Sequence, residues 1–295
     1  MPAALTAPIV LATDVWRQRR AGHERRVDAL VGEHLDRRRV GVKHPVADFL
    51  FTYYAHRPAQ LRRWHPGAGV VLADADPTDL GAEYIATGSG ATLDVAAVRE
   101  RRGAAIGWIR DLLVATASRP PHFGCFGMHE WAMVYRQDAD EIRHRDWPLR
   151  LDPAVVLSQN RVRCSHFDAF RFFTPAARPL NVLQPTRDGQ QANEQPGCLH
   201  ANMDVYRWAY KLSPMVPSEL VVDCFELAKE IRTLDMRASP YDLSDLGFDP
   251  VRVETADGRA EYTRQQRDFA ARAAVLRGQL IDLSGSWEPA APPVG

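Results

Sequence analysis

The fold is decided by residues 198–237, CLHANMDVYRWAYKLSPMVPSELVVDCFELAKEIRTLDMR. Apolar side chains recur there every three or four positions from 201 to 212, which places them on one face of a helix. Pro214 and Pro217 interrupt the pattern, and it resumes from 218 to 234. The stretch therefore predicts two amphipathic helices joined by a short break.

The rest of the chain continues this helical pattern. Further helices are expected at 14–40, 46–56, 94–117, 128–135, 152–158 and 261–283. Residues 68–93 are rich in Gly, Asp and Thr and predict an irregular connection. Only Val251–Glu254, which precedes a turn at 256–258, is expected to form a strand.

These elements predict a mainly α fold, a single globular helical domain with a minor β element. Residues 1–40 are assigned to an N-terminal segment with a basic amphipathic helix, and 41–284 to a helical catalytic domain. The Pro-containing end, 285–295, is expected to be a flexible tail.

Cysteine usage and hydropathy indicate the compartment. The chain has 295 residues, 45% of them hydrophobic, and four cysteines without a CxxC pair. This favours free thiols in a reducing environment rather than a disulfide scaffold. The N-terminus lacks a charged leader, and no apolar run reaches about eighteen residues. We therefore expect a cytoplasmic protein without a membrane partner.

The charge balance limits the kinds of partner. Lys plus Arg and Asp plus Glu number 37 each, so the molecule as a whole has no strong field that would attract phosphate backbones. Arginine clusters at 17–20 and 37–39 allow a local phosphate surface. The carboxylates between them also allow ion pairs along a solvated helix.

Two segments in the middle of the chain combine histidines with aromatic side chains. HFGCFGMHEW (122–131) contains His129 and Trp131, which we assign to substrate binding. RVRCSHFDAFRFF (161–173) follows, and its phenylalanines form either a stacking wall for a flat substrate or ordinary core. The candidates in this second segment are His166 and Asp168 as catalytic residues and Phe167 and Phe170 as substrate-binding residues.

A third segment, residues 194–207, places His200, Asp204 and Arg207 on one side of a helix. His200 and Asp204 are catalytic candidates in this interpretation, and Glu194 and Arg207 are substrate-binding candidates. The alternative is a surface ion-pair row, which contributes little.

Two further positions near helix ends are candidates for anion chemistry. Cys198 is expected near a helix N-terminus, where unpaired amides favour an anion or a thiolate. Arg237, in the loop DMRASPYDL, either receives a carboxylate or phosphate of the substrate or fixes the loop.

Motifs for common cofactors are absent from the sequence. It contains no Walker loop, GxGxxG, GxSxG, HExxH or paired CxxC. No cofactor is therefore expected. A metal at the His, Asp and Glu side chains is the alternative, because these are ligand types that zinc and iron accept.

The chain resembles a family of actinobacterial proteins catalogued as 3-methyladenine DNA glycosylases. The strings that carry the resemblance cover nearly the whole chain: HPVADFLFTYY (44–54), RWHPG (63–67), FGCFGMHEWAMVY (123–135), CSHFDAFRFFTPAARPLN (164–181), EQPGCLHANMDVYRWAYKLSP (194–214) and DMRASPYDL (235–243).

The resemblance implies hydrolysis of the bond between an alkylated purine and its sugar, with damaged DNA as the partner. Such a reaction needs aromatic stacking on an extruded base and a carboxylate that stabilises the sugar cation. Asp168 and Asp204 are the candidate carboxylates, with His166 or His200 positioning water. The competing hypothesis is a small-molecule enzyme, metal-dependent or not, in which the same histidines, Asp204 and Glu194 bind a purine-like or other polar metabolite.

Overall fold

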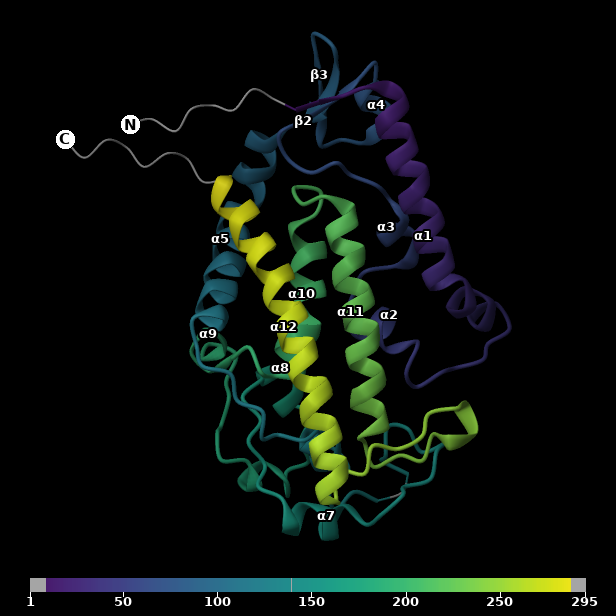
Figure 1. The fold of residues 1–295 in the computed structure, drawn as a ribbon, viewed down its shortest axis with the longest axis vertical. Helices are drawn as coiled ribbons and strands as arrows, with labels where there is room; N and C mark the ends of the chain where they lie inside the picture. The colour runs from purple at the N-terminus through teal and green to yellow at the C-terminus, as the bar shows by residue number, and fades with distance from the viewer. Residues whose placement is uncertain (1–8, 139, 288–295) are drawn as a thin grey trace, which may run out of the picture.

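Two central helices, α10 (Leu199–Leu212) and α11 (Ser218–Arg237), correspond to the pair predicted from the sequence. The structure is a computed structural model that describes residues 9–138 and 140–287. Helix α12 (Ala256–Ser286) packs on both central helices and on α5 (Val95–Ala117), and together the four form a bundle (Figure 1). The prediction of a mainly α fold is therefore confirmed.

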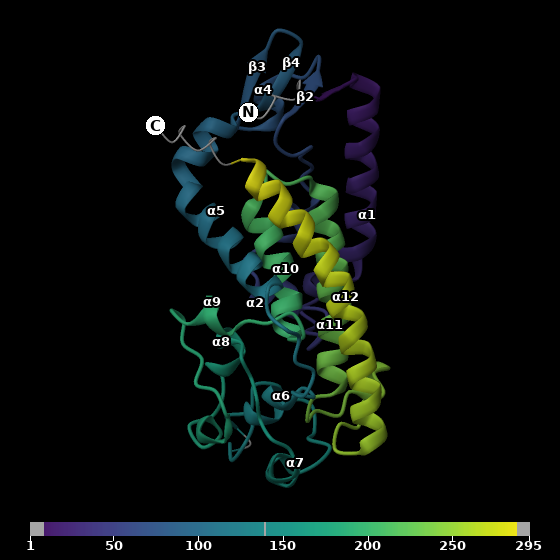
Figure 2. The same ribbon diagram turned by 60° about the vertical axis from the view of Figure 1, so that its left-hand side comes forward.

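The remaining helices surround this bundle. They are α1 (Thr13–Arg39), α2 (Phe49–Tyr53), α3 (Pro58–Arg62), α4 (Pro77–Leu80), α6 (Met128–Ala132), α7 (Pro153–Gln159), α8 (Phe167–Phe170) and α9 (Gln190–Asn193), with 3₁₀ turns at Arg178–Leu180 and Ser244–Leu246. The short helices α6 to α9 lie within a largely irregular stretch beside one end of the bundle (Figure 2). Functional groups can converge there because loops approach the bundle from several directions.

A four-stranded sheet corrects the prediction that residues 68–93 are irregular. The strands are β1 (Ile9–Leu11), β2 (Val70–Ala73), β3 (Tyr84–Thr87) and β4 (Gly90–Leu93), in the order β1-β2-β4-β3. Only β1 and β2 are parallel. The strands have three or four residues, which is too short to show a period of two. Gly90 is required by the close pairing, since a Cβ there would lie 1.9 Å from the Leu72 carbonyl oxygen.

The predicted strand at Val251–Glu254 is wrong. Val251 and Val253 are buried, but the segment makes local turns, in which the Val253 amide donates to the Val251 carbonyl and the Thr255 amide to the Arg252 carbonyl. The alternation of apolar residues therefore reflects burial without strand pairing. The predicted turn at 256–258 is instead the first turn of α12, capped by the Thr255 hydroxyl.

Other boundaries also differ from the sequence prediction. The helix expected at 46–56 shortens to α2, because residues 45–48 form turns before it. Helix α12 extends to Ser286, into the segment expected to be a tail, while residues 288–295 and 1–8 lie outside the described residues. Among the described helices, none has the combination of length and apolar character needed to cross a membrane.

His65 joins the sheet to the bundle. Its amide donates to the Ser218 hydroxyl of α11, and its Nδ1 lies 2.9 Å from the Tyr84 hydroxyl of β3. Burial, followed by the charge of Arg63, lowers the pKa of His65 from 6.5 to about 4. The folded state therefore prefers the neutral ring.

We expect the free energy of unfolding to fall as the pH decreases from 6.5 to about 4. In that window the unfolded chain protonates His65 and the folded chain does not, so its contribution of about 3 kcal/mol is present above pH 6.5 and lost towards pH 4. Urea unfolding across this range should show a shallower slope for His65→Asn, which keeps a polar atom for Tyr84. An unchanged slope would contradict the assignment.

Candidate functional site

Three histidines from separate segments meet at the end of the bundle. His129 lies on α6, His166 precedes α8 and His200 lies in the first turn of α10. The rings of His129 and His200 have centroids 4.4 Å apart, and those of His166 and His200 are stacked at 5.3 Å. All three are buried. Three residues that the sequence analysis selected separately as site candidates therefore lie together in the structure.

Asp235, in the last turn of α11, completes a group of potential metal ligands with two of these rings. Ligand atoms of His129, His200 and Asp235 all lie within 4.8 Å of one another. Asp235 Oδ1 lies 2.7 Å from His129 Nε2, and Asp235 Oδ2 accepts a hydrogen bond of 2.9 Å from Arg232. Burial opposes ionisation of Asp235, but His129, together with His200 and Arg232, lowers its pKa well below the usual range. The group therefore contains a buried carboxylate.

His200 is the member of this group that is free to bind something else. Its ring makes no hydrogen bond with any residue that the structure describes, although the residue is only 7% exposed. Burial, and then repulsion by His129, lowers its pKa well below 6.5. A neutral imidazole keeps a lone pair available to a metal ion or a ligand proton.

His166 belongs to a second ionic group directly beside the first. Its Nε2 lies 3.2 Å from Asp204 Oδ2 and 3.4 Å from Glu194 Oε1. Burial disfavours the charged ring, but the two carboxylates outweigh it and raise the pKa of His166. The pKa of Glu194 is raised by burial. The two acidic side chains of the second group therefore favour the protonated form of the buried His166 ring.

Asp204 is anchored by hydrogen bonds on both oxygens. Tyr54 donates to Oδ1 at 2.6 Å, and Arg207 Nη1 lies 3.1 Å from Oδ2. Although burial disfavours its charge, Arg207 and His166 lower the pKa of Asp204 to about 2. The same Arg207 nitrogen lies 2.5 Å from Asp168. Because Asp204 is fully buried, the alternative of a surface ion-pair row on α10 is wrong.

Four predicted site residues have other roles in the structure. Trp131 is fully buried and donates to the Ala238 carbonyl, and Phe170 packs against Phe173 in the core. Phe167 packs against Arg187. Arg237 donates to the Asp249 carbonyl and so fixes its own loop, which is the second of the two roles considered for it in the sequence analysis. These residues were selected because of their neighbours in sequence, and helix geometry directs their side chains elsewhere.

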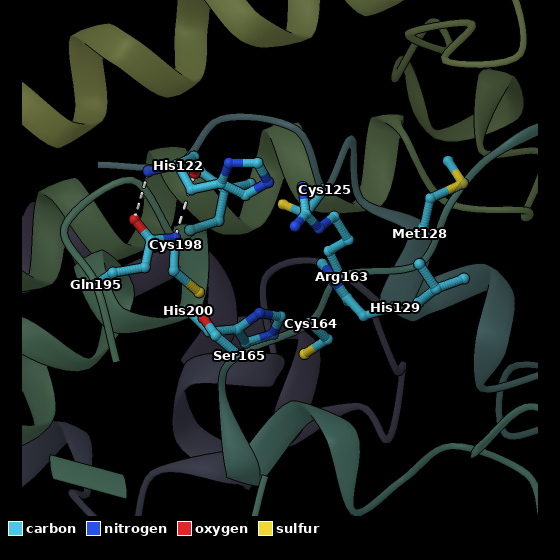
Figure 3. A pocket seen from close by; sticks show the side chains of 12 residues that line it. His122, Cys125, Met128, His129, Arg163, Cys164, Ser165, Gln195, Cys198 and His200 are labelled. Atoms are coloured by element: carbon cyan, nitrogen blue, oxygen red, sulfur yellow. Dashed lines mark hydrogen bonds between the residues drawn. The ribbon is translucent and has the colours of Figure 1, made fainter. Parts of the chain in front are cut away.

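A small cavity beside His200 is lined by sulfur. Its walls include Cys125, Cys164, Cys198 and Met128, together with polar residues such as His122 and Arg163 (Figure 3). Its volume for the centre of a water molecule is about 10 Å³, which is room for about one water or ion. We call it the sulfur-lined cavity.

The thiols of this cavity stay protonated. Burial raises the pKa of Cys164 to about 12 and that of Cys198 well above its ordinary value. The prediction that the helix terminus favours a thiolate at Cys198 is therefore wrong. Cys198 is the N-cap residue of α10. Loss of hydration raises the pKa of its thiol more than the helix N-terminus lowers it.

A second cavity, which shares His200 with the first, is lined mainly by rings. We call it the aromatic cavity, and its walls are formed by Phe49, Tyr53, Glu130, Met133, Arg143, His144, Asp168, Ala169, Phe172, His200, Arg232 and Tyr241. Its volume for the centre of a water molecule is about 40 Å³. Of the predicted site residues, only His200 and Asp168 contribute to its wall.

This arrangement can perform acid-base chemistry and can bind a metal ion. His200 reaches both cavities, while His166 supplies a buried proton and Asp235 a buried charge. Comparison with known proteins finds no family model, no curated protein and no solved structure that matches this chain.

Proposed function

We propose that the protein is an enzyme that acts on a small molecule with the help of a divalent transition metal. The metal would be held by His129, His200 and Asp235. The observation that carries the proposal is that these three ligand atoms lie within 4.8 Å of one another in a buried place, and that His200 has no other polar partner among the described residues.

The donor set fits zinc or iron(II). Two imidazoles and one carboxylate leave positions free for water and substrate, as in catalytic zinc sites and in non-haem iron sites. Arg232 donates a hydrogen bond to Asp235 Oδ2. Contacts of this kind outside the ligand shell orient a ligating carboxylate. When bound, the metal supplies a Lewis acid that activates water or polarises the substrate.

His166 and its two acidic neighbours could transfer protons next to the proposed metal site. Asp204 and Glu194 favour the protonated form of His166, whose ring is stacked on His200. Its Nδ1 is buried and has no hydrogen-bond partner among the described residues. That N–H is available to a ligand or an ordered water, so His166 is the candidate proton donor of the site.

Elemental analysis of protein purified without a metal-affinity tag tests the proposal. We expect about one zinc or iron ion per chain, or uptake of one ion when Zn²⁺ or Fe²⁺ is added to chelator-treated protein. Protein that contains no transition metal and takes up neither ion would contradict the proposal.

Excision of alkylated bases is the second candidate function. It is favoured by Asp168, a carboxylate that lies in the wall of a cavity with several aromatic rings. It is less favoured by α1, where most of the arginines predicted to meet phosphates form ion pairs within the chain. These pairs are Arg19–Glu219, Arg20–Glu24, Arg37–Glu33, Arg37–Asp48 and Arg39–Asp36.

If the second candidate is correct, Asp168→Asn should reduce release of free base from alkylated DNA by about 100-fold or more, because the developing sugar cation loses its counter-charge. Asp146→Asn, at an exposed position outside the aromatic cavity, is the matched control. The measurement is chromatography of released base, with and without a metal chelator. Wild-type protein that releases no base where a known glycosylase does would rule out this function.

A further inference from the structure

We propose that the aromatic cavity takes a one-ring aromatic carboxylate as the organic substrate, and that Arg143 receives the carboxylate group. This inference rests on the proposed small-molecule function and names its substrate class.

The walls of the cavity fit a flat ring. Phe49 and Tyr53 of α2, together with Phe172 and Tyr241, present aromatic surfaces from three separate segments. Its volume of about 40 Å³ exceeds the 10–15 Å³ or so that one water centre needs. Phe172, one of these wall residues, is 39% exposed, so the cavity lies close to the protein surface. The size favours one ring over a two-ring purine.

The charged residues in the cavity wall indicate which substituent the bound aromatic ring carries. Of the four charged residues in the wall, three are compensated within the protein: Glu130 and Arg232 lie 2.8 Å apart, and Asp168 lies 2.5 Å from Arg207. Arg143 is exposed and forms no ion pair within residues 9–138 and 140–287. Its guanidinium lies 6.0 Å from the centre of the Phe172 ring. The cavity therefore has one unpaired positive charge beside an aromatic surface.

Arg232 adds a buried donor to the same wall. It is 2% exposed, its guanidinium lies 3.9 Å from the centre of the Phe49 ring, and its Nε has no hydrogen-bond partner in the described part of the chain. His144 in the wall is neutral, since burial and the neighbouring arginines lower its pKa to about 4. The described wall therefore offers hydrogen-bond donors to an anionic ligand, and both of its carboxylates are already paired with arginines.

The position of His200 connects this cavity with the proposed metal. His200 lies in its wall and is also one of the three candidate ligands. A ring bound between Arg143 and His200 therefore lies next to the place where the chemistry would occur. This shared wall is why we assign the cavity to the substrate and not to a separate regulatory ligand.

Binding of benzoate and benzamide to chelator-treated protein tests the inference. The two probes have the same shape, and only benzoate carries a charge. Calorimetric titration should show benzoate binding about tenfold more tightly than benzamide, as expected for a charge-assisted hydrogen bond. Arg143→Gln should remove this preference. Arg145→Gln, which changes an exposed arginine outside the cavity, should keep it.

Equal binding of the two probes, or a preference that survives in Arg143→Gln, would overturn the inference. Because the metal has been removed, direct coordination of benzoate cannot imitate the expected result. Metal content is measured separately on the same preparation. Metal uptake without a preference for benzoate would support the proposed function and contradict the substrate class. A preference for benzoate without metal uptake would support the substrate class and contradict the proposed metal-dependent function.

Discussion

Replacing His200 with alanine is expected to weaken metal binding by about 100-fold or more, so that the purified variant contains almost no metal. The residue would supply one of three protein ligands, and loss of even an outer contact to a metal ligand typically costs 10–100-fold. The fold should persist, because the His200 ring makes no hydrogen bond with the described residues and its removal leaves no partner unpaired. Elemental analysis and titration with Zn²⁺ against a chromophoric chelator measure the change.

His122→Ala is the matched control for this variant. His122 contacts the sulfur-lined cavity, as His200 does, but it is exposed and lies outside the three-residue ligand group. We expect it to bind metal like the wild type. If His200→Ala retained wild-type metal content, or if both variants lost metal equally, the assignment of the ligand group would be wrong.

The fold could be predicted from sequence where the periodic segments are long. Helices α10 and α11 each present several turns of apolar residues, so their existence is evident from spacing alone. The sheet could not be predicted in this way. Strand β1, at Ile9–Leu11, is paired with Val70–Leu72, a contact between distant segments that no local pattern encodes. Short strands depend on tertiary contacts more than on their own sequence.

The site was predicted in part. His129, His166 and His200 were identified because histidines concentrate in three short polar and aromatic segments. Asp235 was missed, although it follows Ile231 and Leu234 in the inward stripe of α11, where an acidic residue is unusual. An acid within an apolar helix face is therefore a usable signal. The aromatic wall gave no such signal, because its phenylalanine and tyrosine rings come from three segments that only the fold brings together.

Replacing Asp204 with alanine is expected to lower the free energy of unfolding by about 3–5 kcal/mol, the cost of leaving a buried charge unpaired. The carboxylate is fully buried between His166, Arg207 and the Tyr54 hydroxyl. Its loss would leave two cations close together without their counter-charge. Urea unfolding at pH 7 measures the change.

Two further variants separate this electrostatic role from packing. Tyr54→Phe removes one hydrogen bond to Asp204 and leaves the charges in place, so it should cost only about 1–3 kcal/mol. His166→Gln combined with Asp204→Ala removes one of the stranded cations and should recover part of the loss, as a non-additive pair. If the double variant were as unstable as the sum of its single changes, Asp204 would act through packing alone. If it recovers stability, a loss of activity in Asp204 variants reflects disruption of the ionic group, which makes Asp168 the carboxylate to test for a direct catalytic role.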